Sequence, residues 1–218
     1  MCFSATASFA VGAGLIAPSY YSISKTESRQ MLMLASTPVV FSALQISEGF
    51  LWLSLQHHDY ASWYKPSLYS YSFISQAVWP AWTTLAVWMM EPDKRRKKIL
   101  NYFVLLGIAS SLYMIYCLLT SNISAAAEHG HIRYYREFPF LNATRVVNFI
   151  TMAVTPFFSS LRYMKIFATG LMALLLMAYF FYTNYLISVW CFFASILSIM
   201  IILIIKYNNP SAIQPALK

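Results

Sequence analysis

The chain has 218 residues, of which 59% are hydrophobic and only 10% are charged. Soluble domains carry about 25% charged residues, so the composition excludes an ordinary soluble protein and indicates a membrane protein. The formal net charge is +8, which in a soluble chain would suggest a nucleic-acid partner. Here the basic residues lie in short segments between apolar runs, so membrane topology explains them and we expect no nucleic-acid partner.

Seven apolar runs approach the ~20 residues that a helix needs to cross a bilayer. We therefore predict an all-α integral membrane protein, a seven-transmembrane-helix bundle. It would form a single domain over residues 1–210, followed by a short cytoplasmic tail, 211–218. In chain order the runs are 3–23, 31–55, 68–90, 99–120, 140–161, 166–182 and 186–207.

Lysine and arginine are segregated between the connections. Eleven of the fifteen lie in the first, third and fifth connections and the tail: Lys25, Arg29, Lys94, Arg95, Arg96, Lys97, Lys98, Arg162, Lys165, Lys206 and Lys218. The second and fourth connections hold only Lys65, Arg133 and Arg136. Because cytoplasmic loops are enriched in basic residues, we predict an outside N-terminus and a cytoplasmic C-terminus. We interpret the run 93–98 as the signal that fixes this topology; binding of acidic membrane lipid is the alternative.

Seven crossings with this orientation suit two architectures. One is a receptor- or opsin-like bundle, although the last run has no lysine before Lys206 to hold retinal. The other is a pair of three-helix repeats joined by the fourth helix, a 3+1+3 arrangement of the kind found in SWEET-type sugar transporters. A weak similarity between residues 17–23 and 155–161, each followed by a basic loop, favours the second, and coincidence is the alternative.

The second run contains a carboxylate, Glu48, three residues after Gln45. A charged side chain inside a membrane is costly and usually functional. These residues and Trp52 share one helical face, and Gln76 and Trp79 lie at similar depth in the third run. We therefore predict an outward-facing ligand pocket around Glu48, lined by Gln45, Glu48, Trp52, Gln76, Trp79, Tyr134 and Arg145. Polar contacts that only hold helices together are the alternative for such faces.

Arg145 lies within the fifth run, where it either reaches to the membrane surface or neutralises Glu48. Histidine and cysteine residues could also bind a metal, because imidazole and thiolate are transition-metal ligands. The candidates are His131, His129, Cys2 and Cys191. Their spacing matches no established metal motif, so we assign no cofactor, and solvated loop histidines are the alternative. Cys2 and Cys191 are also the pair to test for a disulfide.

Several stretches resemble a family of short bacterial multi-pass membrane proteins to which no activity is assigned. They are MCFSATASF at 1–9, QISEGFLW at 45–52, WPAW at 79–82 with EP at 91–92, HIRY at 131–134 and SVWCFF at 188–193. The resemblance implies a protein of the bacterial cytoplasmic membrane. It implies no reaction or substrate.

Three functions fit these observations. The best supported is transport or binding of a small molecule in the pocket around Glu48. The second is a membrane-embedded, metal-dependent enzyme in which Glu48 acts as acid or base beside His131. The third is a ligand sensor or assembly factor. Membrane lipid is an expected partner in each case, and assembly into a homo-oligomer stays open.

Overall fold

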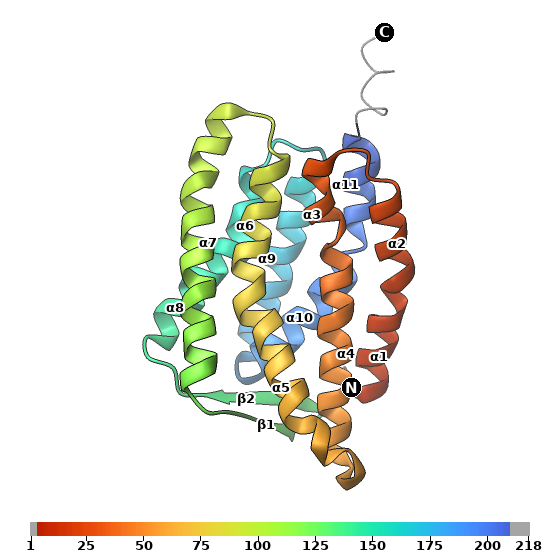
Figure 1. The fold of residues 1–218 in the computed structure, drawn as a ribbon, viewed down its shortest axis with the longest axis vertical. Coiled ribbons are helices and arrows are strands. Elements are labelled where there is room, and N and C mark those ends of the chain that lie inside the picture. Colours follow the sequence, from red (N-terminus) through yellow and green to blue (C-terminus); the bar gives the residue numbers. More distant parts are fainter. Residues whose placement is uncertain (1–3, 210–218) are drawn as a thin grey trace.

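The computed structural model describes residues 4–209, which are mostly helical (Figure 1). The first helices are α1 (Ala5–Gly14), α2 (Ile16–Ser24), α3 (Leu32–Ala35), α4 (Thr37–Gln56), α5 (Tyr64–Ser72) and α6 (Trp79–Met90). The later elements are α7 (Lys94–Thr120), β1 (Ile123–Glu128), β2 (His131–Arg136), α8 (Leu141–Phe149), α9 (Met164–Phe181), α10 (Leu186–Leu197) and α11 (Met200–Asn208). Short 3-10 helices lie at Arg29–Met31, His58–Trp63, Thr155–Phe158 and Thr183–Tyr185.

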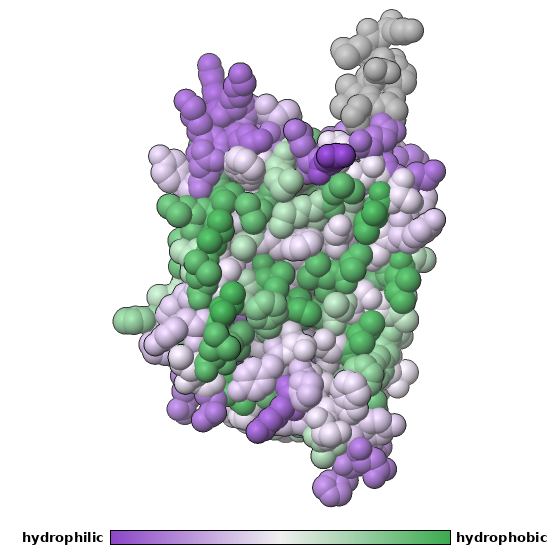
Figure 2. All heavy atoms as spheres, viewed as in Figure 1, coloured by the Kyte–Doolittle hydropathy of each residue, from purple (hydrophilic) through white to green (hydrophobic). Residues whose placement is uncertain are grey.

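Within the described part of the chain, three helical segments are long and apolar enough to cross a membrane: Arg29–Gln56, Lys94–Thr120 and Met164–Phe181. A fourth crossing follows if Thr183–Leu197 and Met200–Asn208, which bend by 42° at their junction, are counted as one. Figure 2 shows a mainly apolar band across the middle of the face in view, between two polar ends. The structure thus confirms a mostly helical chain with apolar helices of crossing length.

Helix α7 displays this apolar character most directly. It begins at Lys94, so the basic run that the sequence placed in a loop forms its first turns, capped by a hydrogen bond from the Arg95 N–H to Asp93. One stripe along the rest of the helix is apolar or aromatic and 61–81% exposed: Tyr102, Leu105, Leu112, Tyr116 and Leu119. A stripe of this kind is costly in water and favourable against lipid.

The remaining predicted crossings are interrupted by irregular turns. A π-helical turn, Phe73–Val78, separates α5 from α6 just before Pro80, whose ring disrupts regular helix in the preceding turn. A second π-helical turn, Ile150–Val154, follows α8 and leads into the 3-10 helix at Pro156. Residues 17–23 are regular α-helix, whereas 155–158 are 3-10 helix, so this pair of segments does not support an internal repeat.

The expectation of an all-α fold is wrong in one place. Strands β1 and β2 form an antiparallel hairpin, in register from Ile123 opposite Arg136 to Glu128 opposite His131. The turn places His129 at φ 50° and Gly130 at φ 76°, a left-handed pair suited to two-residue hairpin loops. The hairpin lies across the end of the bundle where α7 finishes and α1 begins (Figure 1). β1 contacts α4 and α5, and β2 contacts α10.

Glu91 links two connecting segments at the end of the bundle opposite the hairpin. It is 2% exposed and accepts hydrogen bonds from the Ser160 backbone N–H at 2.7 Å and the Ser160 hydroxyl at 2.6 Å. Arg96 adds hydrogen bonds to the carbonyl groups of Phe158 and Ser159. These bonds join the connection between α6 and α7 to the segment that precedes α9.

Candidate functional site

Glu48 is fully buried in α4, and hydroxyl groups surround it instead of a cation. Its Oε1 accepts hydrogen bonds from the Ser188 hydroxyl at 2.6 Å and the Tyr134 hydroxyl at 3.3 Å. Within residues 4–209 the ion pairs are Arg96–Asp93 and Arg133–Glu128, so Arg145 does not neutralise Glu48. Glu48 therefore links α4 to α10 and to the hairpin through neutral donors.

Tyr134 connects this buried group to a cavity. Its ring stacks on Tyr71 of α5, with centroids 4.9 Å apart and planes 6° from parallel. The Tyr71 hydroxyl donates to the Ile187 carbonyl at 3.4 Å and lies within hydrogen-bonding reach of the Cys191 thiol. Burial, with the nearby Glu48 carboxyl, holds the pKa of Tyr134 well above its ordinary value, so its hydroxyl remains a proton donor.

The alternation of β2 decides which side chains face the bundle. Ile132, Tyr134 and Arg136 share the inner face, because successive side chains of a strand point to opposite sides. Arg133 and Tyr135 lie on the outer face, where both bond to Glu128.

Arg136 lines the cavity beside Arg145. Burial and the neighbouring charge of Arg145 lower the pKa of Arg136 to about 10, which still leaves the guanidinium protonated at neutral pH. Its buried Nε makes no hydrogen bond to any described residue. Arg145, from α8, donates to the Asn142 side chain at 3.3 Å. Two cations therefore lie close enough to repel each other, and neither forms an ion pair within the described residues.

The cavity measures about 360 Å³ and lies between β2, α8, α9 and α10, with the π-helical turn before α6 contributing two residues. Among residues 4–209, Arg136 and Arg145 are the only charged residues that line it, and no carboxylate from this part of the chain does. The other lining residues are Ser75, Gln76, Tyr134, Val146, Asn148, Phe149, Met152, Leu175, Leu176, Tyr179, Thr183, Asn184, Tyr185, Leu186, Ile187, Trp190 and Cys191. The wall is thus mainly aromatic and apolar, with one positively charged region and three side-chain amides, those of Gln76, Asn148 and Asn184.

The cavity is not centred on Glu48, which corrects the expected location. Of the predicted pocket residues, Gln76, Tyr134 and Arg145 line it, whereas Gln45, Glu48 and Trp52 do not. The polar face of α4 is covered instead by α1, α5 and α10, which leaves Gln45 0% and Trp52 2% exposed. The side-chain amide of Gln45 makes no hydrogen bond within the described part of the chain.

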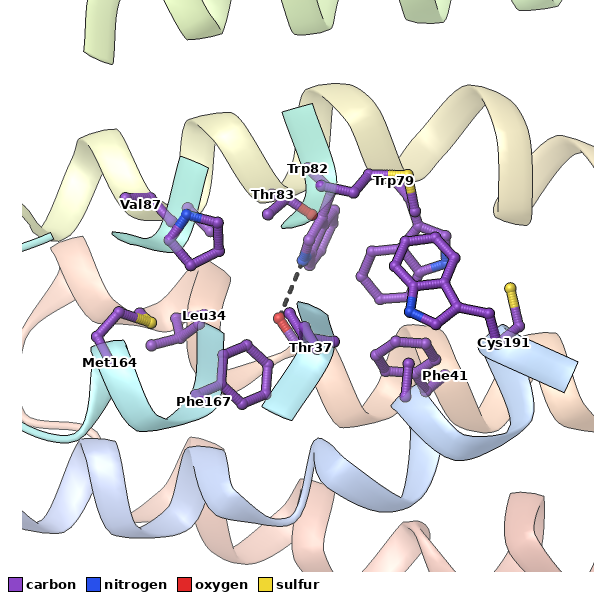
Figure 3. A pocket seen from close by; sticks show the side chains of 16 residues that line it. Leu34, Thr37, Phe41, Trp79, Trp82, Thr83, Val87, Met164, Phe167 and Cys191 are labelled. Atoms are coloured by element: carbon purple, nitrogen blue, oxygen red, sulfur yellow. Dashed lines mark hydrogen bonds between the residues drawn. The ribbon is translucent and has the colours of Figure 1, made fainter. Parts of the chain in front are cut away.

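A second, smaller cavity of about 50 Å³, called the inner cavity below, lies among α4, α6, α9 and α10 (Figure 3). Trp79, the last of the predicted pocket residues, lines it together with Phe41, Phe167 and other apolar side chains. The Trp82 indole N–H donates to the Thr37 hydroxyl at 3.1 Å, whereas the indole N–H groups of Trp79 and Trp190 make no hydrogen bond within the described residues. Met152, Trp190 and Cys191 line both cavities, which are therefore adjacent.

The metal candidates do not come together. Within residues 4–209 no group of three or more His, Cys, Asp or Glu side chains is arranged to hold a metal ion. His129 lies 3.4 Å from the Tyr185 hydroxyl, and His131 packs against Tyr182 and Tyr185. Cys191 is a buried free thiol, and Cys2 lies outside the described residues.

Sequence reasoning missed four residues of this region: Arg136, Asn148, Tyr71 and Ser188. Arg136 was counted among the loop cations, although its two-residue spacing from Tyr134 was a usable signal once a strand is assumed. Asn148 lies one helical turn after Arg145 and accepts a hydrogen bond from Ser110 at 2.6 Å. Tyr71 has no distinguishing local pattern, and Ser188 stands out only as the first residue of the stretch 188–193.

Residues 1–216 match the model of a family of unknown function, DUF6629, and the chain belongs to that family. The expectation of a family without an assigned activity is confirmed. No curated protein and no solved structure matches the chain.

Proposed function

We propose that this DUF6629 member is a seven-helix, multi-pass protein of the bacterial cytoplasmic membrane that binds and transports a small organic anion. The binding site is the cavity between β2, α8, α9 and α10. The observation that carries the proposal is the pair Arg136 and Arg145, which line a mainly aromatic and apolar cavity to which the described residues contribute no carboxylate.

The membrane assignment is supported by the apolar band, the lipid-compatible stripe of α7 and the segregated basic residues. In this proposal α1 with α2, α5 with α6, and α8 with the turns after it are the further crossings. Irregular turns inside crossings are tolerated where protein buries them or where they border a cavity. The basic end is cytoplasmic, so the hairpin and the larger cavity lie in the outer half.

The preference for an anion follows from charge and geometry. Arg136 is largely desolvated and lies near the exposed Arg145, and such a pair of cations is unfavourable unless a counter-charge accompanies it. Guanidinium groups present planar pairs of N–H donors that match a carboxylate or a phosphate. The volume of about 360 Å³ lies at the lower end of ligand-pocket sizes, which suits a small solute. Gln76 and Asn148 offer amide groups to orient the rest of the ligand.

Calorimetric titration of the purified protein in nanodiscs with small carboxylates and organic phosphates tests the binding step. We expect binding that weakens by about 10-fold or more in Arg136→Gln and in Arg145→Gln, because a hydrogen bond to a charged group contributes ~1.5–3 kcal/mol. The matched control is Arg133→Gln, on the outer face of the same strand, which should bind as the wild type does.

Uptake of the bound anion into proteoliposomes tests the transport step. We expect uptake by the wild type and by Arg133→Gln, and loss of uptake in the two cavity variants. Equal binding by all four proteins would contradict the site, and binding without uptake would reduce the function to a receptor or sensor.

A further inference from the structure

The arrangement of the two cavities points to an amphiphile as the ligand. We infer that its carboxylate or phosphate head binds between Arg136 and Arg145, and that its single apolar chain extends past Trp190 into the inner cavity of Figure 3. This inference rests on the proposed function, because it names the chemical class of the anion.

The two cavities follow one face of α9. Leu175 and Tyr179 line the larger cavity, and Met164, Phe167 and Leu171 line the inner one. These residues are spaced by three or four positions, which places them on one side of the helix. From Met164 to Tyr179 the helix rises about 22 Å at 1.5 Å per residue. The charged site and the apolar cavity are thus neighbours along one helix face, with Met152, Trp190 and Cys191 in the wall of both.

The inner cavity has the chemistry of a chain-binding site. Its wall consists mainly of aliphatic and aromatic side chains, among them Leu34, Phe41 and Val87. The hydroxyl of Thr37 is already engaged by the Trp82 indole N–H. The indole N–H groups of Trp79 and Trp190 make no hydrogen bond to a described residue and remain as two donors in this wall. A solute with several polar groups would still find few partners here, whereas each methylene group that enters gains free energy from burial.

The sizes of the two cavities favour one chain over two. The inner cavity measures about 50 Å³ and the outer about 360 Å³, so the space that the structure offers on the apolar side is the smaller of the two. A two-chain phospholipid would need a second apolar channel beside the same head site. A single-chain carboxylate or phosphate monoester needs only one apolar site beside the head site, and the inner cavity is in that place.

A chain-length series tests this inference. The protein in nanodiscs is titrated calorimetrically with straight-chain carboxylates from butyrate to dodecanoate, each below its micelle concentration, and the heats from empty nanodiscs are subtracted. We expect the Kd to fall about fourfold for each added methylene until the inner cavity is filled, and then to level off. The corresponding alkyl phosphates and a short two-chain phosphatidate complete the panel.

Two substitutions change the inner cavity in opposite directions. Ala194→Leu fills it, so the gain in affinity should stop at a shorter chain; Leu171→Ala enlarges it, so the gain should continue to a longer one. Each variant remains informative if the other fails to fold. Leu203→Ala, at a 43% exposed position of α11, is the control and should leave the series unchanged.

The outcomes separate this inference from the proposed function. Arg136-dependent binding of butyrate with no gain from longer chains would overturn the amphiphile and leave the anion site intact. Tighter binding of the two-chain phosphatidate than of any single-chain compound would also overturn it. Absence of binding by every anion would overturn both proposals.

Discussion

Arg133 and Arg136 of β2 show that the face of a strand on which an arginine lies determines what that arginine contacts. Arg133 lies on the outer face of β2 and pairs with Glu128 at 3.4 Å. Arg136 lies on the inner face, in register with Tyr134, and lines the cavity beside Arg145. The same side chain is thus a surface ion pair at one position and a ligand-binding candidate at the other, because the period of a strand is two residues.

The pH dependence of stability should report on His131. Burial lowers the pKa of His131 below its usual 6.5, so the unfolded state binds this proton more readily than the folded state does. The resulting contribution to stability is fully present above about pH 6.5 and is lost as the pH falls through the folded-state pKa. We expect the unfolding temperature to fall on acidification, and to fall less in His131→Gln.

Thermal unfolding of the detergent-solubilised protein at a series of pH values provides the measurement. His58→Gln, at an exposed position, serves as the control and should retain the wild-type dependence. An identical pH profile in wild type and His131→Gln would show that His131 does not contribute.

At the residue scale the sequence predicted part of the site. A carboxylate or a glutamine within an apolar run is conspicuous, so Glu48 and Gln76 were identified without a structure. Whether such a residue faces a cavity or a neighbouring helix depends on helix rotation, which the sequence does not specify when several faces carry polar groups. Gln45 and Glu48 accordingly share a face with Trp52, yet that face is packed against other helices.

At the scale of elements, the contact between α6 and α7 depends on a missing side chain. A Cβ at Gly107 would overlap the Thr84 hydroxyl and the Pro80 carbonyl oxygen. Close approach of this kind is how helices associate in membranes, where packing replaces the hydrophobic effect. We expect Gly107→Ala to reduce the free energy of unfolding by about 1–3 kcal/mol, the usual cost of overpacking.

Gly14→Ala is the matched control for this prediction. No atom lies within 4 Å of the position that its Cβ would occupy, so its effect should stay within about 1 kcal/mol of the wild type. Unfolding by increasing fractions of denaturing detergent measures both variants. Equal stabilities for Gly107→Ala and Gly14→Ala would show that α6 and α7 do not approach as closely as described.

Hydropathy located the helical segments but not their irregular turns. The π-helical turns at Phe73–Val78 and Ile150–Val154 have the same apolar composition as regular helix, so no pattern of hydrophobic residues marks them. The β-hairpin was not predicted, for a different reason. Its first strand carries three consecutive alanines, 125–127, which hide the alternation, and its turn is His129-Gly130 in place of the usual Asn-Gly.

At the scale of the whole molecule, the orientation is open to a direct test. Single cysteines are introduced into a Cys2→Ser background, in which Cys117 and Cys191 are buried. A membrane-impermeant maleimide applied to spheroplasts should label Ser124→Cys in the hairpin, and should label Lys98→Cys only after the membrane is permeabilised. The reverse pattern would place the anion cavity in the cytoplasmic half and contradict the orientation drawn from the basic residues.

The most direct test of the account is a structure determined with a bromine-labelled carboxylate, located by anomalous scattering. We predict a bromine peak inside the cavity and carboxylate oxygens about 2.7–2.9 Å from the guanidinium groups of Arg136 and Arg145. A bromine peak outside this cavity, or a carboxylate that contacts neither arginine, would contradict the account.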